Sequence, residues 1–171
     1  MRKTISLLTV IVLIIVSCKT DKKGENDAYT GATKWVDSLI YPEEIHFKSI
    51  KQITFGGDNA EAYWSFDDSQ IIFQSNNKEW GVECDQMFLM NRNEVFDSIV
   101  PPMISTGKGR TTCAYFLPNN KQFVYGSTHL GGDECPDAPL RREGKYVWPI
   151  YESYDIFVSD LNGNITNQLT T

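Results

Sequence analysis

The sequence lacks the residue patterns that mark most hydrolases and nucleotide-dependent enzymes. It has only two histidines, and it contains no HExxH zinc motif, no serine in a nucleophile-elbow pattern and no glycine-rich phosphate loop. The sequence therefore lacks the usual catalytic residues of metalloproteases and α/β-hydrolases and the usual phosphate-binding loop of nucleotide-dependent enzymes. His46 lies in a strand-like run between Ile45 and Phe47, where we expect it to be structural.

Basic runs are also missing. The chain has 16 Lys and Arg residues against 22 Asp and Glu, and its formal net charge is -6. Proteins that bind nucleic acid carry a basic patch, so this balance excludes a nucleic-acid partner. With 171 residues, of which 41% are hydrophobic, the chain is long enough for one domain with its own core.

Residues 1–17 have the layout of an export signal. Two basic residues, Arg2 and Lys3, precede an apolar run that is too short for a membrane span. The tetrapeptide 15–18, Ile-Val-Ser-Cys, resembles the bacterial lipobox, in which the cysteine receives a diacylglycerol and its new amine is usually acylated too. This resemblance implies a lipoprotein that is anchored through Cys18, since several acyl chains hold a protein stably at a membrane. A plain signal peptide or an uncleaved anchor is the alternative.

The residues after Cys18 predict a tether and a location. Residues 18–31 are charged and nearly free of aliphatic side chains, as is typical of a flexible linker. Lys19 stands where some bacteria place the Asp that retains a lipoprotein in the inner membrane. We therefore expect an outer-membrane lipoprotein, on either the periplasmic side or the cell surface.

An internal repeat predicts the architecture. The stretch AYWSFDDSQIIFQSN, residues 62–76, aligns without gaps with AYFLPNNKQFVYGST, residues 114–128. The polar doublets are turn formers between two β-rich segments, so each copy predicts a hairpin. A third strand follows in each, QMFLMN at 86–91 and DIFVSD at 155–160.

A fourth signal marks where each unit begins. Gln52-Ile53-Thr54 returns as Gln168-Leu169-Thr170, with a weaker copy at 104–106, and Thr54 and Thr106 are 52 positions apart. Four short strands in each unit of this length predict an all-β fold, a β-propeller of four-stranded antiparallel blades.

The repeat resembles the WD-like propeller repeat of TolB-type proteins. Its consensus has Leu-Thr, a short loop, Trp-Ser-Pro-Asp-Gly, a strand and then an Ile-Tyr-x-Met-Asp strand, and the resemblance covers roughly residues 51–171. Phe66 and Asp68 replace the usual Pro and Gly in the first copy. In the second copy Phe116-Leu117 replaces Trp-Ser, and Asn119-Asn120 replaces Asp-Gly.

These signals divide the chain into segments. We predict a capping segment at 32–50, a first blade at 51–103, a second blade at 104–167 and the start of a third at 168–171. Residues 45–50 are either an outer strand that closes the ring or part of a cap over one edge. A propeller needs about four to eight blades, so we expect the chain to be the N-terminal part of a longer protein.

The candidate binding residues lie in the loops that share one face of such a propeller. The longest of these loops, residues 128–153, has 26 residues against about nine between the matching strands of the first blade. Long irregular loops in compact domains are usually binding loops or lids. The candidates on this face are Asp58, Asn59, Glu61, Trp80, Asp85, His129, Asp133, Tyr146, Trp148 and Tyr151. For any one aromatic residue, packing of the loop onto the sheets is the alternative.

Three cysteines remain besides Cys18. Export into an oxidising compartment favours pairing, and our first prediction is a Cys84–Cys113 disulfide, with Cys113–Cys135 as the second. A zinc site of Cys84, Cys113, His129 and Cys135 has suitable ligand types, but no CxxC pair supports it. We predict no cofactor.

We interpret the chain as a non-catalytic propeller that holds a protein or an envelope polymer against its loop-rich face, as the TolB-like resemblance implies. The first alternative is an accessory or gating propeller of a longer secreted peptidase or other hydrolase. The second is a propeller that binds or cleaves glycans, for which Glu61, Asp85, Asp133 and Glu134 offer carboxylates.

Overall fold

A computed structural model describes residues 41–48, 50–94, 99–137, 144–145 and 150–171, all of which belong to one compact unit, residues 31–171. Two antiparallel β-sheets and one short 3-10 helix are the regular elements of this described part, which confirms the all-β prediction. Within the same residues, no helix has the length and apolar character needed to cross a membrane.

The first sheet has three strands in sequential order, β1 (Asp58–Trp64), β2 (Gln70–Asn76) and β3 (Gln86–Asn91). β2 is mostly buried, while all seven residues of β1 are exposed. The exposed strand is therefore an edge strand of this sheet and not part of its core.

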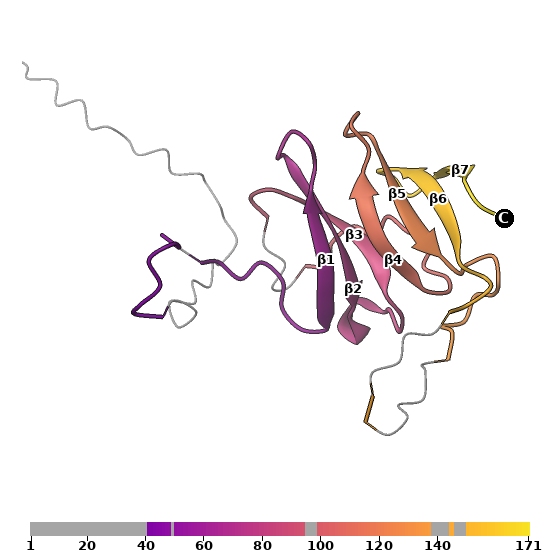
Figure 1. Ribbon diagram of the computed structural model, residues 1–171, viewed down its shortest axis with the longest axis horizontal. Helices are drawn as coiled ribbons and strands as arrows, with labels where there is room; N and C mark the ends of the chain where they lie inside the picture. The colour runs from indigo at the N-terminus through magenta and orange to yellow at the C-terminus, as the bar shows by residue number, and fades with distance from the viewer. Residues whose placement is uncertain (1–40, 49, 95–98, 138–143, 146–149) are drawn as a thin grey trace, which may run out of the picture. The chain divides into compact units, whose positions relative to one another are not determined.

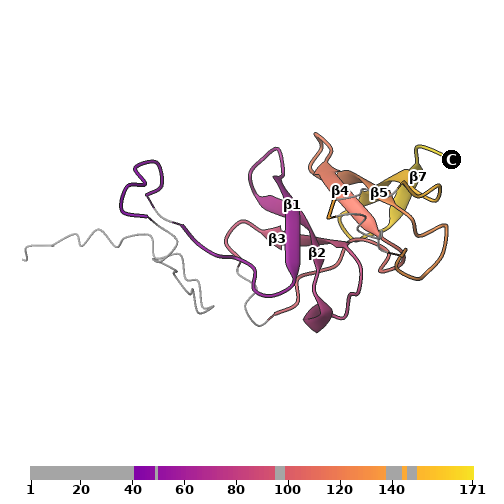
Figure 2. The same cartoon turned by 60° about the horizontal axis from the view of Figure 1, so that its bottom comes forward.

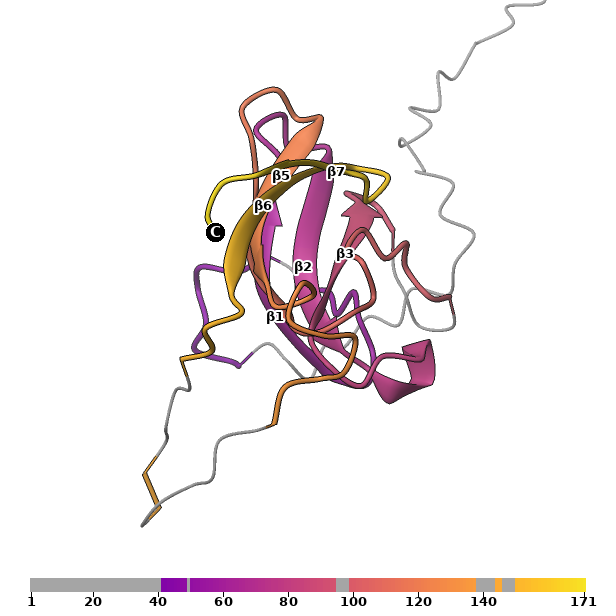
Figure 3. The same cartoon turned by 90° about the vertical axis from the view of Figure 1, so that its right-hand side faces the viewer.

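The second sheet has four strands, β4 (Thr111–Phe116), β5 (Gln122–Ser127), β6 (Asp155–Asp160) and β7 (Ile165–Gln168), again in sequential order. Figure 1 shows the two sheets next to each other, and Figure 2 shows that β4 is the strand of the second sheet nearest the first. Figure 3, from the side, shows that the two sheets are stacked.

The two sheets repeat the same local structure at the spacing of 52 residues found in the sequence. A β-bulge interrupts β1 between Ala60 and Tyr63 and β4 between Thr112 and Tyr115. In the hairpin turns, Asp68 and Asn120 have φ of 56° and 53°. Asp and Asn tolerate this left-handed region better than most residues do, so the turns form although the glycine of the TolB-like consensus is missing from both.

A fourth strand is present in the second sheet, as predicted. In the first unit, residues 95–98, which follow the turn after β3, lie outside the described residues. The described residues after them form an isolated bridge between Phe88 and Met103, flanked by hydrogen bonds from Leu89 N–H to the Pro102 carbonyl and from Ile104 N–H to the Met87 carbonyl. The prediction of four strands is therefore confirmed for the second unit and stays a prediction for the first.

For residues 45–50 the sequence predicted either an outer strand or part of a cap, and the outer strand is not found in the described residues. Residues 45–48 and 50, the described part of that segment, contain no strand. Ile45 is 85% exposed, so its side chain contributes nothing to the core. Residues 32–40, the first part of the predicted capping segment, lie outside the described residues.

The main core lies between the two facing sheets. Ile72 and Met87 of the first sheet pack in one cluster with the aromatic face of the second. The Tyr125 hydroxyl, buried among these rings, accepts a hydrogen bond from Ser159 Oγ at 3.1 Å, which satisfies a polar group that burial would otherwise penalise. Burial raises the pKa of Tyr125, so it stays a neutral phenol. The aromatic members are Phe116, Phe123, Tyr125 and Phe157.

The opposite face of the first sheet has a core of its own. Phe73 and Phe88 contact the ring of Trp80, whose centroid lies 6.4 Å and 5.2 Å from theirs. Trp80 belongs to the 3-10 helix η2 (Lys78–Trp80), and Ile53 packs against the same cluster. Residues from before β1 and after β2 thus cover this face.

We predict that Gly109→Ala destabilises the protein by about 2–4 kcal/mol, because two costs add up. Gly109 has φ of +56°, and a Cβ there would lie 2.6 Å from Thr128 Oγ1 and 3.0 Å from His129 N. Gly81→Ala is the matched control, since Gly81 has φ of +78° but nothing within 4 Å of its would-be Cβ. Urea unfolding should give only about 1–2 kcal/mol for the control. Equal costs at both positions would contradict the close approach at Gly109.

Candidate functional site

The loops of both sheets meet at one end of the strands. In the first sheet the register pairs Asp58 with Asn76 and Ser75 with Gln86, so residues 77–85 lie at the end where β1 begins. In the second sheet Thr111 pairs with Ser127 and Ser127 with Asp155, which places the described parts of the connection, residues 128–137 and 150–154, at the end where β4 begins. The hairpin turns lie at the other end, where Phe66 N–H donates to Asn120 Oδ1 at 2.8 Å. The predicted separation of loops and turns is confirmed.

A buried amide holds the segment that crosses from the first sheet to the second. Gln86 is 1% exposed, and its Nε2 donates to the Gly109 carbonyl at 2.9 Å. Its Oε1 accepts from Ser105 Oγ at 2.7 Å and from Gly107 N–H at 3.2 Å. The Gln86 side chain, at the first position of β3, therefore sets the path of residues 105–109 before β4 begins.

A disulfide joins the two loops that flank this segment. Cys84, at the end of the 77–85 loop, is bonded to Cys135 of the long loop, with their Cα atoms 5.5 Å apart. Cys113 is free and exposed. The predicted Cys84–Cys113 and Cys113–Cys135 pairings are therefore wrong, because Cys113 is the third residue of β4 and not part of a loop.

The disulfide borders a small cavity of about 170 Å³. One side is formed by the 77–85 loop with Gly81 and Glu83, and the other by Asp133 and Glu134 of the long loop. Gly107 lies between the two sides. The cavity is thus built by both sheets, and the disulfide holds its two sides together.

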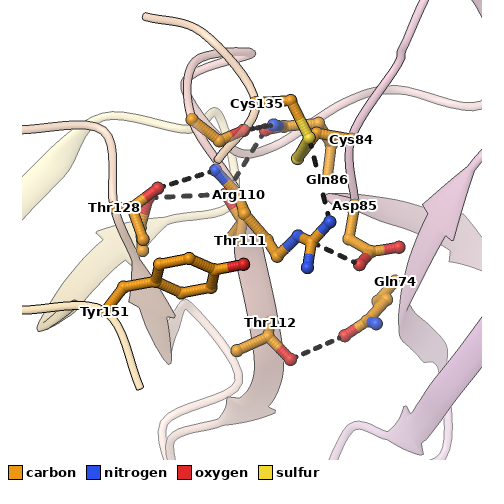
Figure 4. Close-up of polar contacts among 12 residues, drawn as sticks. Gln74, Cys84, Asp85, Gln86, Arg110, Thr111, Thr112, Thr128, Cys135 and Tyr151 are labelled. Atoms are coloured by element: carbon orange, nitrogen blue, oxygen red, sulfur yellow. Dashed lines mark hydrogen bonds and ion pairs between the residues drawn. A yellow bond between two sulfur atoms is a disulfide. The ribbon is translucent and has the colours of Figure 1, made fainter. Parts of the chain in front are cut away.

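Arg110 lies beside the disulfide (Figure 4). Its Nη2 is 3.8 Å from Cys135 Sγ and its Nε is 3.7 Å from Asp85 Oδ2. Burial raises the pKa of Asp85; the Arg110 charge opposes this increase and Asp58 adds to it. The Arg110 and Asp85 side chains are 23% and 24% exposed, and Arg110 Nε itself is buried, so this charge pair is mostly buried at the end of the interface between the sheets.

The backbone of the same segment is tied to the long loop of the second sheet. Arg110 N–H donates to Thr128 Oγ1 at 2.9 Å, and Gly109 N–H donates to the Asp133 carbonyl at 3.0 Å. Lys108 Nζ forms an ion pair with the Asp133 carboxylate at 2.9 Å, with both side chains more than half exposed. An exposed pair of this kind contributes little to stability, but it presents both charges at the rim of the cavity.

His129, in the long loop directly after β5, packs against the second sheet. Its ring lies 4.4 Å from the Phe157 ring, and Nδ1 is 2.9 Å from Ser127 Oγ. Burial lowers the pKa of His129, while Asp155 opposes and Lys108 reinforces the decrease. This imidazole therefore favours its neutral form and packs against the core.

The structure separates the predicted binding residues into groups. Asp133 lines the cavity, Asp85 pairs with Arg110 beside the disulfide, and Asp58 is close enough to influence Asp85. The ring of Trp80 packs in the core, and Glu61 lies at the bulge inside β1, bonded to the Tyr63 hydroxyl.

The remaining candidates are held by local contacts or lie outside the described residues. Asn59 Nδ2 donates to the Gly56 carbonyl at 3.0 Å. The Tyr151 hydroxyl donates to the Asp137 carbonyl, and its ring lies 5.9 Å from that of Tyr154. Tyr146 and Trp148 are not among the described residues.

The weak zinc candidate is wrong. Two of its four ligands, Cys84 and Cys135, are used by the disulfide, while His129 faces Ser127 and Phe157. Among the residues that the structure describes, no group of three or more His, Cys, Asp or Glu side chains could hold a metal ion.

Three polar residues of the site were missed in the sequence. Lys108, Arg110 and Gln86 come from the segment before β4 and the first position of β3. The signal was the sequence GKGR, residues 107–110, since two glycines around a lysine before a predicted strand indicate a special backbone path next to a charged surface.

Comparison with known proteins gives no relative. No protein-family model matches the sequence, and no curated protein or solved structure is significantly similar to it. The arrangement of residues at the loop end is therefore the basis for a functional hypothesis.

We predict that replacing both disulfide cysteines, Cys84→Ser with Cys135→Ser, lowers the free energy of unfolding by about 2–4 kcal/mol, because the crosslink restricts the unfolded chain. Cys113→Ser is the control, and at an exposed thiol we expect a change within about 0.5 kcal/mol. Alkylation of the folded, unreduced protein followed by peptide mapping should label Cys113 and leave Cys84 unlabelled. A labelled Cys84 together with a protected Cys113 would contradict the pairing.

We predict that stability falls as the pH is lowered from 7.5 to 5, and that His129 contributes to this loss. Its pKa is lower in the folded than in the unfolded protein, so the unfolded chain binds the proton more tightly. The contribution is present above the unfolded pKa of about 6.5 and is lost as the pH falls through the folded pKa. Urea unfolding at a series of pH values should show a smaller loss in His129→Gln than in wild type. His46→Gln, at an exposed residue, should retain the wild-type slope; an unchanged slope in His129→Gln would refute the assignment.

Proposed function

We propose that the two sheets are neighbouring blades of a β-propeller of the TolB-like kind. Three features support this proposal: the 52-residue repeat, the same bulge and turn in β1–β2 and β4–β5, and the packing of one sheet on the face of the next. Radially repeated four-stranded sheets are the arrangement in which such units stack.

A second repeated contact supports the same arrangement. Ser105 Oγ accepts from Met87 N–H at 2.9 Å and donates to Gln86 Oε1. In the second sheet Thr170 Oγ1 accepts from Ile156 N–H at 2.8 Å and donates to Asp155 Oδ1 at 2.9 Å. A hydroxyl after the fourth-strand segment thus joins it to the start of the third strand in both units.

The second part of the proposal concerns location. The chain acts at the bacterial envelope, tethered through Cys18 and the linker at 18–31. The export signal and the lipobox-like tetrapeptide support this part of the proposal. A disulfide between Cys84 and Cys135 suits an oxidising compartment outside the cytoplasm.

The function that the geometry supports best is non-catalytic binding of a protein or envelope polymer at the loop end. The observation that carries this proposal is the disulfide between the loops of two different sheets, at a cavity rimmed by charged side chains of both signs. Binding surfaces need loops that are held in place before the partner arrives, because ordering them on binding costs affinity.

The size of the cavity favours a macromolecular partner. At about 170 Å³ it is smaller than the 300–1,000 Å³ or so typical of pockets that enclose small ligands. It can accept one side chain or one sugar unit, while the rim contributes further contacts. Lys108, Glu83 and Glu134 offer donors and acceptors there for polar recognition.

The test is photo-crosslinking from the loop end in cells that export the full chain. A photoreactive amino acid in place of Glu134, which is exposed and lines the cavity, should give a covalent adduct that mass spectrometry identifies as an envelope protein, or crosslinks to the sedimented cell-wall polymer. The adduct should be largely lost in the Cys84→Ser/Cys135→Ser background, because the two sides of the cavity are then no longer joined.

The matched control places the same amino acid at Asn119, an exposed turn residue at the opposite end of the second sheet. This position should give no such adduct. Equal adducts from both positions, or none from Glu134, would contradict binding at the loop end.

A further inference from the structure

A second surface, remote from the cavity, lies on the exposed inner strands. The Tyr63 and Tyr115 rings meet with centroids 5.2 Å apart and planes at 65°, and the Phe66 ring stands at 90° to that of Tyr115 with centroids 6.1 Å apart. All three are well exposed, at 37% for Tyr63, 46% for Tyr115 and 56% for Phe66. We call these three residues the aromatic corner.

A carboxylate lies at the aromatic corner. The Tyr63 hydroxyl donates to Glu61 Oε2 at 2.8 Å, and this hydrogen bond, with the Glu61 charge, raises the pKa of Tyr63. The phenol therefore remains neutral and its ring electron-rich. Asp67, in the turn next to Phe66, has its pKa lowered by hydrogen bonds from Ser65 and Ser69, so it adds a second negative charge on this side.

The repeat shows that the fold does not require the Glu61 carboxylate. Glu61 and Cys113 occupy the same bulge position in β1 and β4, with φ of 50° and 54°. The bulge forms equally with the cysteine side chain of Cys113, so the backbone does not need a carboxylate there. Tyr63 and Tyr115 also occupy equivalent positions in the repeat. In contrast to the Glu61 and Cys113 pair, both copies have an aromatic ring at this exposed position.

Rings at steep angles beside a carboxylate suit a cation. A cation is attracted to the face of a Tyr or Phe ring, and a neighbouring carboxylate adds to this attraction. A sugar ring would prefer one flat aromatic platform, and an anionic ligand would be repelled by Glu61 and Asp67. One exposed cation–π contact improves affinity by only about two- to fivefold, so a free small cation would bind weakly, whereas a peptide segment adds further contacts.

We propose that the aromatic corner and Glu61 bind an arginine or lysine side chain of a protein partner. Tyr63, Tyr115 and Phe66 contact the cation and its aliphatic stem, and the Glu61 carboxylate pairs with its charge. This site is separate from the loop-end cavity, so it stands whether or not the proposed function at that end is correct.

The experiment titrates the full chain with the peptide Gly-Arg-Gly-Arg-Gly and follows the tyrosine ring signals by NMR. The comparison peptide carries citrulline in place of arginine, which keeps the shape and removes the charge. We expect ring-signal shifts for Tyr63 and Tyr115 with the arginine peptide and at least about threefold weaker binding of the citrulline peptide. Binding of the two peptides with equal affinity would overturn the proposal.

Two variants and two matched controls locate the site. Glu61→Gln and Tyr115→Leu should each raise the Kd of the arginine peptide by about two- to fivefold. Glu43→Gln removes a charge from an exposed residue of the segment before β1, and Trp64→Leu removes an exposed ring at the neighbouring position of β1; both should bind as wild type. An equal loss in Glu43→Gln would show general electrostatic attraction, and an equal loss in Trp64→Leu would show non-specific apolar binding, and either would refute the site. If Tyr115→Leu fails to fold, Glu61→Gln decides, since wild-type affinity in that variant overturns the proposal.

Discussion

The crossing from the first sheet to the second depends on the buried side chain of Gln86. Its amide bonds to the Gly109 carbonyl, and its oxygen accepts from Ser105 and from the Gly107 backbone. A buried amide left without these partners would cost the full desolvation of its polar atoms, so the segment 105–109 has little freedom to take another path. The position of β4, the approach of Gly109 to Thr128 and the location of Arg110 all follow from this path.

The same crossing explains why the loop end is a shared surface. Arg110 leaves the segment at the point where Cys84 and Cys135 meet (Figure 4). Lys108 of the same segment pairs with the Asp133 carboxylate of the long loop. Neither sheet alone contains these groups. The aromatic corner is shared in the same way, because Tyr63 and Phe66 belong to the first repeat and Tyr115 to the second. Both proposed binding surfaces are therefore consequences of the contact between the two sheets.

The fold was largely predictable, and the site was only partly so. Strand alternation and turn doublets are local properties, so the ungapped alignment of 62–76 with 114–128 placed both hairpins at equivalent positions, whereas their bulges were not predicted. The fourth strand of the first unit stays a prediction, because residues 95–98 lie outside the described part of the chain and the residues after them form an isolated bridge. Asp85 and Asp133 were predicted at the loop end, and they are found there. Trp80 was predicted on the same binding face, but its ring packs in the core, because a large ring beside a buried sheet gains more from packing against Phe73 and Phe88 than from exposure.

The sequence by itself determined the all-β class, the 52-residue repeat and the separation of loops from turns, because these depend on residues that are close along the chain. Only the tertiary structure decided which cysteines pair, since that choice depends on where β4 begins, and Cys113 lies inside the strand while Cys84 meets Cys135 across the crossing segment. It also decided that Arg110 lies beside Asp85 and that Tyr63 meets Tyr115. Such contacts join residues 25 to 52 positions apart, and their geometry is set by the packing of one sheet on the other, which no local pattern encodes.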